Sequence, residues 1–369
     1  MKPVYIVSWL FALAISFVSC DDWLDKTPKD RLYPDVYFKT EDELRLFTNQ
    51  FYNNLVPSAV DIYSESSDLI VKSDLMLEMS GQRIIPDEGN GWNFTALRDI
   101  NFYLQYSHNC TEVNARNRYD GVARFFRAYF YFEKVKRYGD IPWYDKALDS
   151  DDPELYKARD SREFVMQKML EDLDFAIANL PKTKNAYVLT RWTALALKSR
   201  VCLFEGTFRK YHGLEDCEKY LNACVSASET FMNESGYTLY KSGSTPYRDL
   251  FASINLQADE VIFGRDYEAS LSVLHNVQNY ENSTTMGRPG MNSYLMADGS
   301  RFTDKAGYET MTFDQECQNR DPRLAQTIRT PGYTRIGSTK KEAPNLAYTM
   351  TGYHLIKYSM TANYDEYNK

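Results

Sequence analysis

Residue types that build metal and nucleophile sites are scarce in this chain, which has four histidines and six cysteines in 369 residues. No two histidines are spaced by four residues, and no cysteines form a CxxC pair, so the sequence argues against a structural zinc site. The motifs GxSxG, GxxxxGK[ST], HExxH and GxGxxG are also absent. Their absence disfavours catalysis, and we expect neither a cofactor nor a bound metal.

An excess of positive charge is lacking as well. The chain has 43 Lys and Arg against 51 Asp and Glu, a net charge of −8. This balance excludes nucleic acid as the main partner, because phosphate binding needs a positive surface. Aromatic residues, in contrast, make up 15% of the chain and include 29 tyrosines. Such an excess suits surfaces that meet amphipathic ligands as well as cores.

A targeting segment occupies the first twenty residues. Lys2 precedes an apolar run from Val4 to Val18, which is short for a membrane-spanning helix, and Ser19 then precedes Cys20. We predict that residues 1–19 are a lipoprotein signal peptide and that Cys20 is acylated after cleavage. The alternatives are an ordinary signal peptide or a membrane anchor. Acylation would leave five cysteines, an odd number that argues against a disulfide framework and favours thiols acting as small hydrophobic residues.

One strongly aromatic stretch, Asp120 to Tyr144, predicts the central helix of an α-helical scaffold. Its apolar residues recur at steps of three and four, as in Val122, Phe125, Phe126, Tyr129, Phe130 and Val135. Gly139 is suited to the C-terminal cap, and Pro142 prevents the helix from resuming. The cationic residues between the rings are interpreted as a solvated face: Arg124, Arg127, Lys134, Lys136 and Arg137.

Further helices follow from capping signals and apolar periodicity. Thr40 with Glu43 predicts a helix to Leu55, and Asp160 with Glu163 predicts one that Pro181 ends. Other helices are expected over residues 92–105, after a cap at Thr190, and over residues 214–232. The four helices from the central one onward suggest two stacked pairs of tetratricopeptide type. Residues 237–369 contain short buried runs between long polar stretches.

The central stretch also resembles a known family. ARFFRAYFYFEKVKRYGDIP, residues 123–142, is similar to the signature helix of the SusD/RagB family of bacterial outer-membrane nutrient-binding lipoproteins, of starch-binding type. The DEVIF run at 259–263 and the NRDPRL run at 319–324 are similar to two further motifs of that family. We interpret the second as a turn that Pro322 fixes and that Arg–Asp pairing neutralises.

The resemblance implies a mainly α fold, a tetratricopeptide-like helical scaffold with long irregular loops and a few short strands. We expect a single SusD-like domain over residues 20–369, with a mostly helical scaffold at 20–236 and a loop-rich ligand-binding part at 237–369. Family members continue beyond the stretch that matches Gly352 to Tyr358 into C-terminal helices, so the C-terminal part is expected to be truncated.

The implied function is non-catalytic capture of a nutrient at the cell surface. By resemblance, the lipid-anchored protein would bind an oligosaccharide, or a peptide, at the outer membrane and pass it to a SusC-like TonB-dependent transporter. Asp21 and Asp22 are similar to the family's acidic export signal. The alternatives are a glycoside hydrolase or other glycan-active enzyme, and a helical-repeat scaffold that binds proteins only.

Candidate ligand-binding residues follow from the chemistry of sugars, whose flat C–H faces stack on exposed rings and whose hydroxyls meet planar polar side chains. Long loops on a rigid frame are where such residues tend to lie. By location we predict two groups: Trp92, Asn93 and Arg83, then Tyr280, Arg288 and Tyr294. Each has a structural alternative, since the tryptophan could staple the start of a helix and a tyrosine could be a core ring.

Overall fold

The computed structural model describes residues 36–57, 69–72, 77–86, 89, 91–253, 255–273, 284–347 and 349–359. The signal segment with Cys20, the acidic pair that follows it and Tyr280 lie outside the described residues.

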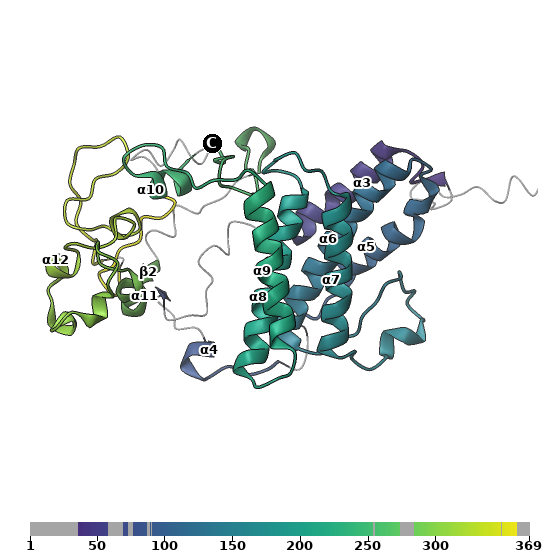
Figure 1. Cartoon of the computed structure of the whole chain (residues 1–369), viewed down its shortest axis with the longest axis horizontal. Helices are drawn as coiled ribbons and strands as arrows, with labels where there is room; N and C mark the ends of the chain where they lie inside the picture. The colour runs from purple at the N-terminus through teal and green to yellow at the C-terminus, as the bar shows by residue number, and fades with distance from the viewer. Residues whose placement is uncertain are drawn as a thin grey trace, which may run out of the picture.

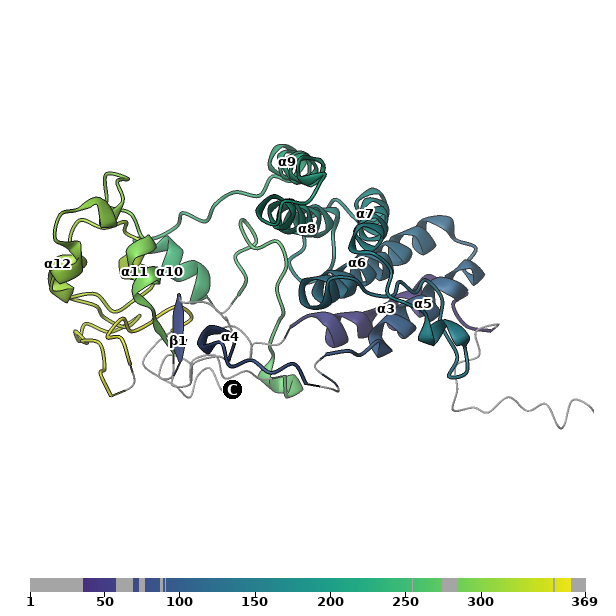
Figure 2. The ribbon, with the colours of Figure 1, turned by 90° about the horizontal axis from the view of Figure 1, so that it is seen from below.

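The longer helices stack side by side in a layer (Figure 1). They are α3 (Glu41–Leu55), α5 (Thr95–Tyr106), α6 (Val113–Tyr138), α7 (Arg162–Asn179), α8 (Arg191–Tyr211) and α9 (Cys217–Glu234). Helix α9 packs on α8, α8 on α7, and α7 on α6, while α3 and α5 cover the other side of α6 (Figure 2). The stacked helical scaffold that the sequence predicts is therefore confirmed.

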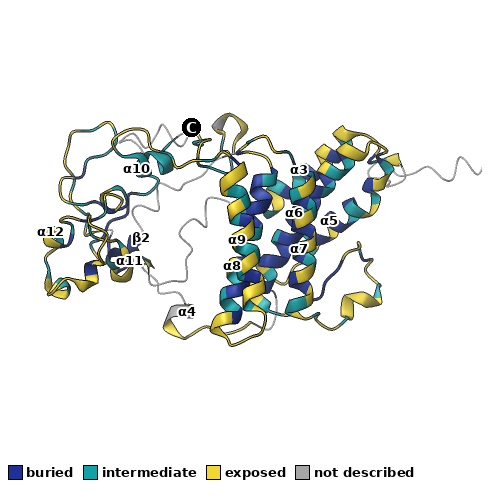
Figure 3. Cartoon of the chain, viewed as in Figure 1, coloured by how far each residue is buried: buried dark blue, intermediate teal, exposed yellow. Residues whose placement is uncertain are grey.

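Helix α6 is the centre of the layer, and many of its residues are buried (Figure 3). Its rings form much of the main core. Phe126 is 1% exposed and lies edge to face with Phe51 of α3 and with Phe125, at centroid distances of 6.1 and 5.4 Å. The helix starts at Val113, earlier than predicted, and ends at Tyr138; the C-cap residue is Gly139, whose φ of 71° explains the glycine there. The predicted ring-rich face is thus buried from both sides.

Two predicted N-caps are confirmed and one is wrong. Thr40 forms the capping box with Glu43, and Thr190 forms one with Thr193. Helix α7, however, is capped by Ser161, whose hydroxyl accepts a hydrogen bond from the Phe164 amide. The predicted cap, Asp160, instead accepts a hydrogen bond from the Trp143 amide, 17 residues away. The Asp160 carboxylate therefore makes a long-range contact instead of the helix cap that its local spacing predicted.

After α9 the described chain has short elements. They are α10 (Pro246–Phe251), α11 (Arg288–Ser293) and α12 (Phe313–Glu316), with α4 (Leu77–Ser80) before α5. Strand β1 (Ile70–Lys72) pairs antiparallel with β2 (Thr284–Met286), with Ile70 opposite Met286. Single 3₁₀ turns occur at Ser107–Asn109, Pro153–Tyr156, Ala269–Leu271, Phe302–Asp304, Tyr308–Thr310 and Leu324–Gln326. The long irregular connections and few short strands agree with the predicted fold class.

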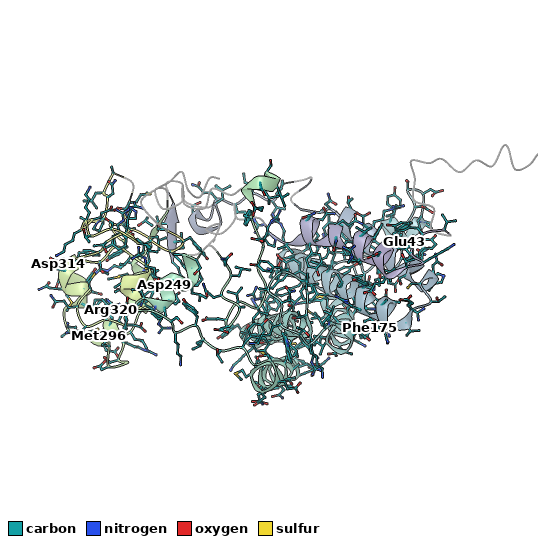
Figure 4. The ribbon with its side chains drawn as sticks, turned by 90° about the horizontal axis from the view of Figure 1, so that it is seen from above. Glu43, Phe175, Asp249, Met296, Asp314 and Arg320 are labelled. Carbon is teal, nitrogen blue, oxygen red and sulfur yellow. The ribbon has the colours of Figure 1, made fainter. Side chains whose placement is uncertain are left out.

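A second hydrophobic cluster, which includes Met286, Met291 and Leu324, lies away from the helical layer. Figure 4 shows Arg320 and Asp314 at this end of the molecule and Phe175 and Glu43 at the other. The guanidinium of Arg320 is buried, donates to backbone carbonyls and faces the Phe302 ring at 3.9 Å. Arg323 pairs with Asp321 at 3.0 Å, as the turn interpretation predicted.

The five cysteines in the described chain are free thiols. Cys110 and Cys202 are buried, and Cys217, Cys224 and Cys317 are partly buried, which confirms their interpretation as small hydrophobic residues. Within the described ranges no helix has the length and apolar character that crossing a bilayer requires. The same ranges contain no cluster of three or more His, Cys, Asp or Glu placed to hold a metal ion.

Replacing Phe126 with alanine tests the core of α6. Because the ring is almost fully buried, we expect Phe126→Ala to lower the free energy of unfolding by about 3–5 kcal/mol in chemical denaturation. The control is Tyr211→Ala, which truncates a ring that is 81% exposed and should change stability by no more than about 0.5 kcal/mol. Equal midpoints for the two variants would mean that another face of α6 forms the core.

Candidate functional site

A cavity of about 580 Å³ lies beside the start of α5, between that helix and the segment 142–159. We call it the Trp92 cavity. Its lining includes the rings of Trp92, Phe94 and Tyr144 and several cationic side chains. Its volume lies within the range of about 300–1,000 Å³ that is common for small-molecule sites.

The Trp92 ring is held in place by its neighbours while 40% of the residue stays exposed. Its centroid lies 5.3 Å from that of Phe94 and 4.9 Å from that of Tyr138, both edge to face. The turn before it is fixed by Lys134 of α6, whose ammonium donates to the Gly91 carbonyl, and Gly91 has a φ of 83°. The ring is therefore rigid before any ligand arrives.

The opposite wall is attached to α6 through Tyr131. Its hydroxyl accepts a hydrogen bond from the Tyr144 amide at 2.7 Å, and its ring stacks on Trp143 with centroids 4.2 Å apart. The Lys157 ammonium donates to the Trp143 carbonyl at 2.6 Å. Burial raises the pKa of the Tyr144 hydroxyl, and the carboxylates of Asp160 and Glu154 raise it further, so this hydroxyl is neutral at pH 7.

Beneath both walls lies a buried ion pair. Arg127 of α6 binds Asp172 of α7 through two hydrogen bonds, of 2.6 and 2.8 Å. Its third nitrogen donates to the Asn101 side chain of α5 at 3.2 Å. Asn101 in turn donates to the Tyr144 carbonyl at 2.8 Å. The pair thus links three helices to the cavity wall.

Arg127 corrects the interpretation of the cationic residues on α6 as a solvated face. It is 7% exposed, because it lies between α5 and α7 where Asp172, itself 2% exposed, neutralises it. A signal existed in the sequence, since Asp172 stands inside the apolar stripe of α7 between Met169 and Leu173. A carboxylate in such a stripe requires a buried cation.

The predicted binding residues fall in different places. Trp92 lines the cavity, whereas Asn93 and Arg83 are not among its lining residues. The Asn93 side chain accepts a hydrogen bond from the Thr95 amide at 2.8 Å, so it supports the first turn of α5.

Arg288 and Tyr294, the two described residues of the second predicted group, lie on and beside α11, which is on the far side of α8 and α9 from α5 (Figures 1 and 2). The Tyr294 hydroxyl donates to the Thr327 hydroxyl at 2.9 Å, and its ring packs on the second hydrophobic cluster. Arg288 donates to the Glu309 carbonyl at 2.9 Å and lies 3.5 Å from a carboxylate oxygen of Glu316. The structure therefore does not bring Arg288 and Tyr294 together with Trp92.

Sequence reasoning missed most of the Trp92 cavity. The unnoticed lining residues include Phe94, Arg98, Tyr144, Lys157 and Arg159. A second cavity of about 460 Å³ lies among α6, α8, the two residues that follow α3 and the segment 260–263, and it was also not foreseen. Its lining combines Phe126 and Tyr129 with one cation, Arg200, and one carboxylate, Glu260.

The helical layer is similar in fold to solved structures of other proteins. The fold is similar to a SusD-like protein of Bacteroides fragilis, with a TM-score of 0.72 and 19% identity, over 93% of this chain and 73% of that one. A SusD-like carbohydrate binding protein of the same species gives a TM-score of 0.64 and 17% identity, over 85% of this chain and 64% of that one.

The sequence agrees with the fold. A SusD-like family model described as "Starch-binding associating with outer membrane" matches residues 80–191. A SusD-like protein of Formosa agariphila is 26% identical over 294 residues, which is 74% of this chain and 55% of that protein. A second one is 25% identical over 226 residues, 55% of this chain and 43% of that protein. The chain thus spans about half the length of these relatives. Sequence and fold are therefore both similar to those of SusD-like proteins.

The buried pair can be tested by breaking one side of it. Arg127→Gln removes both short hydrogen bonds to the buried Asp172 carboxylate and leaves Arg124, 3.6 Å away, as its remaining cation, so we expect a loss of up to about 3–5 kcal/mol in the free energy of unfolding. The matched control is Lys168→Gln on α7, which breaks an exposed pair with Glu171 and should cost less than about 1 kcal/mol. Urea denaturation that gives equal midpoints for the two variants would contradict the structural role of Arg127.

Proposed function

We propose that this protein is a non-catalytic surface lipoprotein that binds an oligosaccharide in the Trp92 cavity and passes it to a SusC-like TonB-dependent transporter. The observation that carries the proposal is a rigid, partly exposed tryptophan on a cavity of ligand size, with polar donors around it. The printed names of the family model and of one structural relative, which refer to starch and to carbohydrate, support the same direction.

The cavity suits a sugar on physical grounds. A pyranose presents a flat C–H face that an indole ring covers well, and its hydroxyls need hydrogen-bonding partners at the edge of that ring. The Trp92 ring is fixed by Phe94 and Tyr138, so little side-chain entropy is lost when a ligand binds. The Lys157 ammonium and the Tyr144 hydroxyl supply polar groups from the opposite wall.

The lining supports binding in preference to hydrolysis. Glycoside hydrolases generally use two carboxyl groups, one on each side of the scissile bond. None of the described residues that line the Trp92 cavity is an aspartate or glutamate. A glycan-active enzyme is therefore the weaker alternative, and a peptide ligand remains an outcome of the binding test below.

Membrane attachment belongs to the same proposal. Residues 1–19 would be removed, Cys20 would carry the lipid, and residues 20–369 would form a single domain, helical to about residue 236 and loop-rich beyond it. The family model's reference to the outer membrane supports this location. The transporter would receive the ligand from the anchored protein at the cell surface.

Calorimetry against a panel of oligosaccharides and short peptides tests the site. We expect Trp92→Ala to weaken oligosaccharide binding on the order of tenfold, since it removes the stacking surface and about 1.4 kcal/mol of binding free energy. The control, Tyr211→Ala, removes an exposed ring that does not line the cavity and should bind as the wild type does.

The second predicted group provides a competing site for the same measurement. If the double variant Tyr280→Ala, Tyr294→Ala loses affinity while Trp92→Ala keeps it, the ligand binds near α11 instead. Preferential binding of peptides would change the ligand class. Turnover of any ligand would overturn the non-catalytic proposal.

Lipid attachment has its own test. Cys20→Ala should abolish acylation, because the thiol that receives the lipid is gone, and the protein should leave the detergent phase in phase partitioning. Cys217→Ala, which removes a partly buried free thiol in α9, should partition as the wild type does. Unchanged partitioning of the Cys20 variant would place the anchor elsewhere.

A further inference from the structure

We infer that the Trp92 cavity selects anionic glycans, whose sugar units carry carboxylate or sulfate groups. This inference rests on the proposed function and specifies the ligand class for the same site. It arises from the charges that line the cavity, which differ in sign from the charge of the chain as a whole.

The described lining of the cavity contains four cationic side chains, which are Arg98, Lys146, Lys157 and Arg159, and no carboxylate. The whole chain, in contrast, has a net charge of −8. A concave surface that is lined by cations raises the local concentration of anions and increases their association rate. The second cavity, lined by Arg200 and Glu260, has one charge of each sign and offers no such preference.

Three of the four cations form ion pairs with carboxylates that do not line the cavity. The pairs are Lys146–Glu154 (2.9 Å), Lys157–Asp160 (2.9 Å) and Arg98–Asp149 (3.7 Å). These pairs are partly or largely exposed, and exposed pairs contribute little stability. An incoming anion therefore shares these cations at low cost, and they provide the attractive field around the site.

Arg159 is different from the other three cations. Its guanidinium lies 5.0 Å from the centroid of the Trp92 ring, and it makes no hydrogen bond or ion pair with any residue of the described chain. Five N–H donors are thus available in a planar fork that fits a carboxylate or sulfate with two parallel hydrogen bonds. The structure assigns to Arg159 the recognition of the ligand's carboxylate or sulfate group.

The position of Arg159 fits the geometry of an acidic sugar. In a uronic acid the carboxylate is attached directly to the pyranose ring, and in a sulfated sugar the sulfate is one oxygen away from it. A sugar that contacts Trp92 therefore brings its anionic group next to the guanidinium that lies against the same indole. Stacking and charge recognition then act on one sugar unit.

Calorimetry with charge-matched pairs of ligands tests the inference. The probes are galacturonate and mannuronate oligosaccharides with their methyl esters, and sulfated galactan oligosaccharides with their desulfated forms. We expect wild-type protein to bind at least one acid at least tenfold more tightly than its neutral partner, with an advantage that shrinks as salt is raised. Arg159→Gln should remove most of that advantage and leave affinity for the neutral partner unchanged.

The control is Arg301→Gln, which makes the same change of charge at an exposed arginine beyond α11 that does not line the cavity. It should retain the wild-type preference. The pair of charged and neutral oligosaccharides with the larger difference in affinity identifies whether the site recognises carboxylate or sulfate.

The contrary outcomes are distinct. Equal affinity of the wild type for charged and neutral partners overturns the inference and leaves the proposed function standing. So does equal loss of both partners in Arg159→Gln with unchanged thermal stability, because the arginine would then be a general contact. Absence of binding to every charged and neutral oligosaccharide overturns the proposed function as well.

Discussion

The buried pair between Arg127 and Asp172 is the interaction on which the arrangement of this molecule depends. Two charges that are almost fully removed from water are tolerated only when they neutralise each other with good geometry, and both hydrogen bonds here are 2.8 Å or shorter. The pair joins α6 to α7, and Asn101 extends it to α5 and to the backbone at Tyr144. Helix packing and cavity wall are therefore coupled through one guanidinium.

This coupling explains why the cavity is rigid although one of its walls is a long irregular segment. The segment from residue 140 to 160 contains little regular structure, yet Tyr131, Asn101 and Lys157 hold its backbone at several points. Of the lining residues, Trp92 and Phe94 directly precede α5, whereas Tyr144 and three of the four cations belong to the segment. The fold is shared with solved structures at 17–19% identity, and irregular segments on such a scaffold generally vary more in sequence than its helices.

The local features of the fold were predictable because their partners are close in sequence. Thr40 and Glu43 are three residues apart, as are Thr190 and Thr193, and Gly139 follows its helix directly. The amphipathic pattern of α6 likewise needs only its own residues to predict a buried face. The family motifs then indicated the scaffold, and the fold confirmed it.

What the sequence by itself determined was therefore the helices, most of their caps and the aromatic face of α6, since interactions within about four residues decide these features. The tertiary structure decided the burial of Arg127, whose partner Asp172 is 45 residues away, and the use of Asp160 on the Trp143 amide. It also decided that Trp92 and Arg159, far apart in the chain, meet at one cavity while Arg288 and Tyr294 do not. Such contacts depend on how the helices stack, and the spacing of residues along the chain does not determine that stacking.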